Sequence, residues 1–276
     1  MLFRSTAHAA RQAQRRLAEA TREHKDAALR TMAAHLRVKA SSVLAANALD
    51  LERARAAGMR PGLIDRLALS AKRIEAICIA LEEIAALPDP VGQIVDGQRL
   101  PNGLRVRRVR VPMGVVGMIY EARPNVTADV AALTIKSGNA VILRGGSAAQ
   151  DTNAVIVDIL RQALDAVDLP ADLVSTVDAA GREGARALMH ARGLIDVLVP
   201  RGGAGLIRTV VEESRVPVIE TGSGNCHVYV DASAQVRPAV DIIVNAKTQR
   251  VGVCNAAETL RSEEHTSELQ SQPTIS

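Results

Sequence analysis

The stretch GVVGMIYEARPNVTADVAALTIKSGNAVILRGGS, residues 114–147, decides the fold class of this chain. An apolar run at 115–120 predicts a buried strand, a helical pattern follows at 126–136, and a second apolar strand is predicted at 140–143. The glycines after the second strand lead into another helix, expected at about 149–166. A strand, a helix and a strand in this order indicate a βαβ unit with parallel strands.

The same alternation continues toward the C-terminus. Further strands are predicted at 173–177, 195–199, 216–219 and 228–230, and further helices at 184–190 and 206–214. Apolar strands that alternate with helices are typical of a doubly wound, mostly parallel sheet. We therefore expect an α/β fold whose ligands bind at the carboxyl ends of the strands.

The residues before the 114–147 stretch predict helices and then a ribbon. Residues 4–87 carry apolar side chains at helical spacing, with a break at 58–62 and a second helical stretch at about 70–87. Residues 93–111 alternate apolar and charged side chains around Asp96-Gly97 and Asn102-Gly103, which predicts paired strands with tight turns at these dipeptides. The ribbon's arginines indicate an exposed face, either an oligomerisation arm or a charged edge that resists aggregation.

Composition limits the classes of partner. The chain has 276 residues, enough for one or two domains with a large core, and its 47% hydrophobic content is ordinary for a globular protein. One Phe, two Tyr and no Trp argue against stacking on single-stranded nucleic acid. The net charge of +4 is spread along the chain, which favours a solvated surface over a nucleic-acid interface and suits small phosphorylated ligands.

The cysteines and the hydropathy indicate a cytoplasmic protein without a metal. Cys78, Cys226 and Cys254 are far apart and show no metal-ligand spacing, which is typical of a reduced compartment. No apolar run reaches the roughly 18 residues of a membrane span. The Arg-rich N-terminus resembles a transit peptide, but its apolar residues recur at helical spacing, so we expect an amphipathic helix instead.

Cys254 has surroundings that suit a nucleophile. It lies in VNAKTQRVGVCNAAETL, residues 244–260, two residues after Gly252 and close to the cations Lys247 and Arg250. A thiol attacks only as thiolate, the form that nearby cations and backbone N–H donors favour. Cys78, by contrast, lies in an apolar run. The residues alone leave open whether Cys254 performs acyl or carbonyl chemistry or is a buried spectator.

Two Gly-rich loops each follow a predicted strand and precede a helix. They are Arg144 to Ser147 and Arg201 to Gly205. Glycines let a phosphate approach the backbone, and a helix N-terminus offers free N–H groups. Neither loop matches the dinucleotide fingerprint or the P-loop. Each alone fits a tight turn equally well, but two in one α/β region favour a nucleotide site.

Two further candidate segments lie at the ends of predicted strands. In YEARPNVT, residues 120–127, Asn125 either caps the following helix or donates to a developing oxyanion, and the residues alone favour the cap. Cys226 and His227 are adjacent on a predicted strand and point to opposite faces, so they are not expected to pair. Cys226 is expected to be a small core residue.

Five motifs in order make a family resemblance specific. YEARPNVT, VILRGG, PRGGAGL, TGSGNCHVYVD and NAKTQRVGVCNAAETL resemble the gamma-glutamyl phosphate reductases (glutamate-5-semialdehyde dehydrogenases) of the aldehyde dehydrogenase superfamily, over residues 1 to about 260. The resemblance implies NADPH-dependent reduction of L-glutamyl 5-phosphate to L-glutamate 5-semialdehyde and phosphate, in proline biosynthesis in the cytoplasm. An aldehyde-oxidising dehydrogenase of the same superfamily, or an inactive nucleotide-binding fragment, is the alternative.

The resemblance also implies roles for individual residues. Cys254 matches the catalytic cysteine, which forms a thioester, and Asn125 matches the oxyanion asparagine. Arg144 stands where the superfamily places a cofactor-binding lysine. Ser147 replaces a glutamate of NAD-preferring relatives, which suits NADP. The remaining implied cofactor contacts are Gly145, Gly146, Gly202, Gly203 and Gly205.

The substrate contacts rest on charge and proximity. Arg123 and Arg250 are candidates for binding the substrate's phosphate or carboxylate. Glu220 falls near the superfamily's general base, but a reductase that must not hydrolyse its thioester has less need of that base. No metal is implied.

The resemblance divides the chain into five segments. These are an N-terminal helical part of the cofactor domain (1–90), a β-ribbon oligomerisation arm (91–112), an NADP-binding α/β domain (113–230), the start of a truncated catalytic domain (231–260) and a tail (261–276). The tail, RSEEHTSELQSQPTIS, resembles a translated sequencing adaptor and is expected to be non-native. The full-length protein is expected to be a homo-oligomer, and the truncated chain is expected to be inactive.

Overall fold

The chain forms two compact units, residues 1–220 and 221–276. The computed structural model describes residues 2–121, 123–220, 224–251 and 253–263. Gly252, the start of the TGSG segment at 221–223 and most of the expected tail, 264–276, lie outside the described residues. The two units are described separately below.

Five helices open the first unit, as the helical spacing predicts. They are α1 (Leu2–Ala18), α2 (Arg22–Val38), α3 (Ala40–Ala56), α4 (Pro61–Leu67) and α5 (Ala71–Ala86). Thr21 caps α2 by accepting the His24 N–H at 3.3 Å, and Ser70 caps α5 by accepting the Arg73 N–H at 3.2 Å. Pro61 occupies the first turn of α4, so the predicted break at 58–62 is confirmed.

A four-stranded parallel sheet lies at the centre of this unit. Its strands are β3 (Val115–Tyr120), β4 (Ala140–Arg144), β5 (Val174–Thr176) and β6 (Val197–Arg201), in the order β5-β4-β3-β6. Every residue of β3 is buried, because this strand has a neighbour on each side and helices above and below. The predicted α/β fold with a parallel sheet is confirmed.

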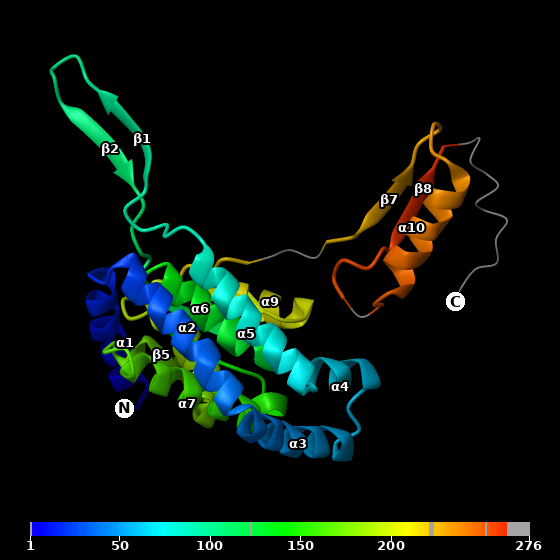
Figure 1. The fold of residues 1–276 in the computed structure, drawn as a ribbon, viewed down its shortest axis with the longest axis horizontal. Coiled ribbons are helices and arrows are strands. Elements are labelled where there is room, and N and C mark those ends of the chain that lie inside the picture. Colours follow the sequence, from blue (N-terminus) through cyan, green and yellow to red (C-terminus); the bar gives the residue numbers. More distant parts are fainter. Residues whose placement is uncertain (1, 122, 221–223, 252, 264–276) are drawn as a thin grey trace. The chain divides into compact units, whose positions relative to one another are not determined.

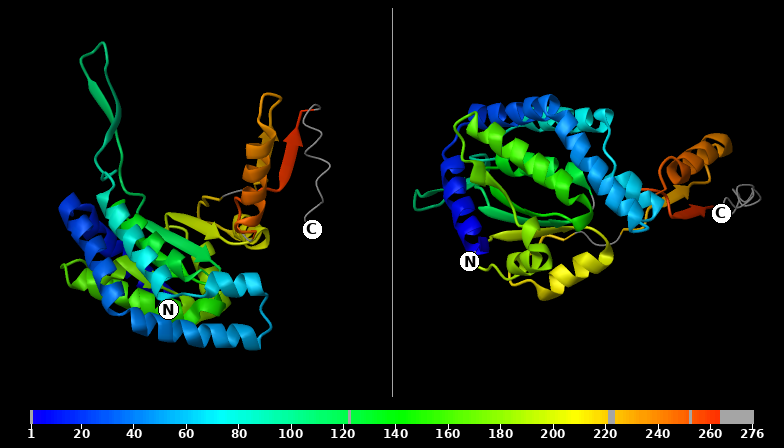
Figure 2. Two further views of the ribbon diagram at one scale, coloured as in Figure 1. Left: turned by 45° about the vertical axis from the view of Figure 1, so that its right-hand side comes forward. Right: turned by 90° about the horizontal axis from the view of Figure 1, so that it is seen from below.

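Helices alternate with the strands. They are α6 (Pro124–Lys136), α7 (Gln150–Asp165), α8 (Gly181–Met189) and α9 (Ala204–Glu213), with 3₁₀ turns at Ser147–Ala149, Ala171–Leu173 and Asp178–Ala180. The chain moves from β3 to β4 to β5, then returns past β3 to β6. Right-handed crossovers therefore put α6 and α7 on one face and α8 on the other, as Figure 2 shows.

An outer layer of helices covers α6 and α7. Helices α2 and α5 pack against each other, and contact α7 and α6 respectively (Figure 1). The almost fully buried Lys136 of α6 pairs with Asp26 of α2 and donates to the Ala85 carbonyl oxygen of α5 at 2.7 Å. A buried ammonium is tolerated only where such partners replace its water. This cluster therefore fixes three helices relative to one another.

The strand predicted at 216–219 does not form a full ladder. Only Val218 makes a parallel bridge, to Leu198, because Pro217 has no N–H to extend the pairing. The Leu198 N–H donates to the Pro217 carbonyl at 2.8 Å, and the Ile219 N–H donates to the Leu198 carbonyl at 2.9 Å. The prediction of a strand here was wrong.

A two-stranded ribbon stands apart from the central sheet (Figure 1). Antiparallel strands β1 (Ile94–Arg99) and β2 (Arg105–Val109) form it, and all their residues are exposed. The predicted turn at Asn102-Gly103 is confirmed: Gly103 has φ +87, and the Asn102 side chain accepts the Leu104 N–H at 3.1 Å. The predicted turn at Asp96-Gly97 was wrong, because these residues lie within β1, where Asp96 pairs with Arg108 and Gly97 with Arg107; the register shift of the ribbon lies just before them, between Ile94 and Asp96.

The second unit is a small parallel βαβ arrangement. Strand β7 (His227–Val230) pairs in parallel with β8 (Thr259–Ser262), and α10 (Val236–Thr248) connects them. The strand predicted at 228–230 is thus confirmed, but its partner is β8 and not a strand of the four-stranded sheet. Among the described residues of the whole chain, no helix has the length and apolar character needed to cross a bilayer.

Candidate functional site

Both Gly-rich loops lie at one edge of the central sheet. Strands β4 and β6 flank β3 in parallel, so the carboxyl ends of all three strands meet there. Arg144 at the end of β4 is opposite Ile119, and Arg201 at the end of β6 is opposite Tyr120. The chain reverses its direction of travel across the sheet between β3 and β6, and such a switch point is the usual ligand crevice of an open α/β sheet.

The first loop depends on close packing at Gly145. A Cβ there would lie 2.1 Å from Nδ2 of Asn153 and 3.2 Å from the Tyr120 ring, so only glycine fits. The Gly145 N–H donates to the Asp178 carboxylate at 2.6 Å. In this structure, therefore, the Gly145 amide is bound by the protein, and the loop offers Gly146 and the exposed Ser147 toward solvent.

A buried hydrogen-bond chain lies beneath this loop. The Thr127 hydroxyl donates to the Asn153 side-chain oxygen at 3.0 Å, so the Tyr120 hydroxyl, 2.7 Å from Thr127, is the donor in that second bond. Burial raises the pKa of Tyr120, which keeps this donor protonated. The chain links β3, α6 and α7, and so connects the helix that carries Asn125 with the loop that carries Arg144.

Asp178 is one of the residues of this site that the sequence did not single out. It follows β5 and accepts the Gly145 N–H, while burial raises its pKa and that hydrogen bond lowers it in part. Its position directly after a strand was the signal that could have identified it. The half-buried Arg144 lies close by, with its Nε donating to the Gly181 carbonyl at 3.4 Å.

Replacing Asp178 separates its role as acceptor from its charge. Asp178→Ala leaves the Gly145 N–H without its acceptor and is expected to lower the free energy of unfolding by about 1–3 kcal/mol. Asp178→Asn keeps an acceptor and removes a charge whose burial is unfavourable. Because burial raises the pKa, the Asp178 contribution to stability is full at acidic pH and is lost as pH rises through that raised pKa.

Chemical unfolding of the 276-residue chain between acidic and neutral pH measures both effects. Relative to the unsubstituted chain, Asp178→Asn is expected to gain stability as pH rises, whereas Asp178→Ala is destabilised throughout. A stability difference between Asp178→Asn and the unsubstituted chain that does not change with pH would show that the carboxyl group does not titrate in this way.

The second loop holds a carboxylate. Gly203 precedes α9, and its N–H donates to Oε2 of Glu121 at 3.1 Å. A Cβ on Gly202 would lie 2.7 Å from Glu121 Cδ and from Leu206 Cδ2, whereas Gly205 has open space around it. The Glu121 carboxylate thus lies at the N–H that opens α9, in the place that a phosphate takes in a phosphate-binding turn. The sequence did not single out Glu121, although it directly follows strand β3.

Asn125 does not cap its helix. Pro124 is the first residue of α6 and Arg123 the cap residue, without a side-chain cap bond, so the chain enters the helix before Asn125. The Asn125 side chain is exposed, and its Nδ2 donates to Oδ2 of Asp129 at 3.0 Å, one turn on. The capping interpretation was wrong, and the amide is held on the helix surface instead.

Cys254 lies in the second unit, in an exposed turn between α10 and β8. The Ala257 N–H donates to the Ala246 carbonyl at 3.0 Å, which ties the end of this turn to α10. Cys226 is half-buried, and its Sγ donates to the Cys254 carbonyl oxygen at 3.3 Å. The expectation of a core position for Cys226 was wrong, because it precedes β7 in a loop beside this turn. Arg250 shares this unit, whereas Arg123 belongs to the first.

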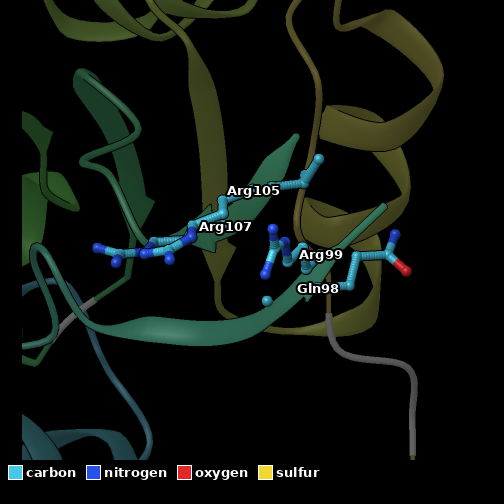
Figure 3. Close-up of a pocket in the computed structure, with 6 residues that line it drawn as sticks. Gln98, Arg99, Arg105 and Arg107 are labelled. Carbon is cyan, nitrogen blue, oxygen red and sulfur yellow. The ribbon is translucent and has the colours of Figure 1, made fainter. Parts of the chain in front are cut away.

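Among the described residues no cluster of three or more His, Cys, Asp or Glu side chains has the arrangement to bind a metal ion. A shallow hollow on the ribbon is lined by Gln98, Arg99, Arg105 and Arg107, together with Gly97 and Val106 (Figure 3). The residues that line this hollow belong to β1 and β2 and to neither Gly-rich loop.

Known proteins resemble this chain over most of its length. The gamma-glutamyl phosphate reductase of Kineococcus radiotolerans is 59% identical over 251 residues, 91% of this chain and 58% of that protein. The reductase of the same name from Thermobifida fusca is 55% identical over 257 residues, 93% of this chain and 62% of that protein. The chain therefore spans about three fifths of the length of these curated relatives.

The fold has matching solved structures. The crystal structure of gamma-glutamyl phosphate reductase from Thermotoga maritima superimposes with a TM-score of 0.89 at 42% identity, over 96% of this chain and 64% of that one. The enzyme of the same name from Saccharomyces cerevisiae gives a TM-score of 0.74 at 30% identity, over 96% of this chain and 66% of that one. The family model for aldehyde dehydrogenases matches residues 3–268. With this match and the parallel sheet described above, the chain belongs to the aldehyde dehydrogenase family.

Proposed function

We propose that this chain is the cofactor-binding part, with the catalytic cysteine, of an NADPH-dependent reductase that converts L-glutamyl 5-phosphate to L-glutamate 5-semialdehyde and phosphate. The observation that carries the proposal is the identity of 55% to 60%, over 251 to 257 residues, to proteins named gamma-glutamyl phosphate reductase. The reaction would be a step of proline biosynthesis.

The proposed chemistry begins at Cys254. Its thiolate attacks the acyl carbonyl carbon, the new C–S bond forms, and the C–O bond to phosphate breaks, so phosphate leaves. The amide of Asn125 and the backbone N–H of Cys254 would stabilise the negative charge that develops on the carbonyl oxygen. Covalent capture divides one difficult displacement into two easier steps, and the thiolate is released with the aldehyde.

The residues at the sheet edge fit a phosphorylated cofactor. The helix start at Gly203 and the open space around Gly205 support a role in binding pyrophosphate, which would replace the Glu121 carboxylate at the Gly203 N–H. Arg144, Gly145, Gly146 and Ser147 would hold the adenosine side, and Ser147 adds no charge that would repel a 2′-phosphate. When bound, NADPH supplies the hydride that reduces the acyl carbon.

The remaining assignments are part of the same proposal. Arg123 and Arg250 would bind the substrate's phosphate or carboxylate. The exposed ribbon of β1 and β2 would pair with a second copy, which makes the complete protein a homo-oligomer. A cytoplasmic location would keep the Cys254 thiol reduced, as this mechanism requires.

Dependence on phosphate tests the proposal. The assay uses a fusion protein in which the Kineococcus radiotolerans relative supplies the residues that follow Leu260, and records NADPH formation from glutamate 5-semialdehyde and NADP. We expect oxidation only when phosphate is present, because phosphate must release the acyl group from Cys254. Equal oxidation without phosphate would mean that water releases the acyl group, which is the aldehyde-oxidising alternative with Glu220 as base.

A further inference from the structure

Two thiols lie at one end of the second unit. Strands β7 and β8 are parallel, with His227 opposite Thr259, so the segments that precede them lie at the same end. Cys226 directly precedes β7, and Cys254 lies in the turn before β8. The Cys226 Sγ is 3.3 Å from the Cys254 carbonyl oxygen, so one thiol already touches the backbone of the other cysteine.

Hydrogen bonds hold these two segments together. The Cys226 carbonyl accepts the N–H of Glu258 at 2.9 Å and that of Thr259 at 3.1 Å. The Thr259 hydroxyl donates to the Asn225 side-chain oxygen at 3.0 Å. The approach of the cysteines is therefore fixed by bonds that do not involve either sulfur atom.

We propose that Cys254 and Cys226 form a reversible disulfide when hydrogen peroxide oxidises Cys254. The Cys254 thiolate attacks the peroxide oxygen, the O–O bond breaks, and Cys254 becomes a sulfenic acid while hydroxide leaves. The Cys226 thiol then attacks the Cys254 sulfur, the S–OH bond breaks, and water leaves with the thiol proton. Two thiols are oxidised to one disulfide, and one peroxide is reduced to two waters.

The contact between the two cysteines favours this bond. A disulfide needs Cα atoms about 4.4–6.8 Å apart. The Cys254 carbonyl oxygen and the Cys254 sulfur belong to one residue, so we expect rotation about its Cα–Cβ bond, together with a shift of the turn, to bring the two sulfurs together. Neither cysteine lies in a helix or a strand, so the shift breaks no regular pairing.

Cys78 is a built-in comparison. It is fully buried in helix α5 of the first unit, and burial raises the pKa of its thiol. A thiol in such a site is inert to peroxide. The arrangement thus selects Cys226 as the partner of the oxidised Cys254.

The disulfide would protect the nucleophile. A sulfenic acid without a nearby thiol proceeds to sulfinic acid, which small thiols do not reverse, whereas a disulfide is reduced by thiol exchange. The consequence for catalysis rests on the proposed function; the disulfide itself does not.

Peptide mapping of the peroxide-treated 276-residue chain tests the proposal. Trypsin without reductant is expected to give peptide 216–247 linked to peptide 251–261, two hydrogens lighter than the separate peptides, and dithiothreitol should release both. Cys226→Ser keeps a hydroxyl donor for the Cys254 carbonyl but cannot form the bond. In that variant, trapping of sulfenic Cys254 by dimedone should rise about tenfold over the unsubstituted chain.

Cys78→Ser is the matched control and should leave the yield of the linked peptide unchanged. Equal dimedone labelling in the unsubstituted chain and in Cys226→Ser would overturn the proposal, as would a linkage between Cys254 of two chains. The mapping needs no turnover, so a linked peptide together with phosphate-independent oxidation by the fusion protein would refute the proposed function and leave the disulfide standing.

Discussion

Replacing Cys254 with serine is expected to lower the phosphate-dependent activity of the fusion protein by roughly 10⁴-fold or more, because a hydroxyl without an adjacent base is a far weaker nucleophile than a thiolate. Cys254 is exposed in a turn, so the substitution removes no core packing. The measurement is the initial rate of NADPH formation from glutamate 5-semialdehyde, NADP and phosphate.

The control for this substitution is Cys78→Ser at the buried cysteine of α5. It should reduce stability but leave the rate per folded molecule unchanged, since Cys78 is buried in helix α5 and belongs to neither Gly-rich loop. Retention of more than about a tenth of the activity by Cys254→Ser would rule out the thioester mechanism.

Replacing Asn125 with alanine is expected to reduce kcat by about 10²–10³-fold, the usual effect of removing one oxyanion donor. The side chain is exposed on α6 and donates to Asp129, one turn on along the same helix, so the fold does not depend on it. The free energy of unfolding should therefore change by less than about 0.5 kcal/mol.

A second variant separates donation from packing. Asn125→Asp has nearly the same shape but places a carboxylate where the oxyanion develops, beside the Asp129 carboxyl, whose pKa burial already raises. Its kcat should fall at least as far as that of Asn125→Ala. If both variants lost stability in proportion to activity, the role of Asn125 would be structural.

The sequence was sufficient for the fold of the first unit because its signals are local and repeated. The apolar runs at β3, β4 and β6 alternate with helical patterns, and a buried parallel strand requires such a run at every position. The errors arose where a residue's chemistry overrides the pattern. Pro217 cannot extend a ladder although its neighbours are apolar, and Gly97 lies within a strand although Asp-Gly is typical of a turn.

The sequence also located the edge of the site but not its hydrogen bonds. Both Gly-rich loops follow strands of a sheet that the βαβ pattern predicts to be parallel. The carboxyl ends of parallel strands lie at one edge, so the common edge of the two loops could be predicted. The hydrogen bonds at this edge join residues from separate segments of the chain. Asp178 accepts the Gly145 N–H, Glu121 accepts the Gly203 N–H, and the Thr127 hydroxyl donates to Asn153. No periodicity in the sequence encodes contacts between residues so far apart.

The sequence by itself determined the α/β class, the family resemblance and Cys254 as the candidate nucleophile, because these depend on residue types and their order. Only the tertiary structure decided that the Gly145 amide is already bound, that Asn125 does not cap its helix, and that Cys226 touches Cys254. The physical reason is that such contacts depend on packing and register, which bring together residues that are distant in the chain.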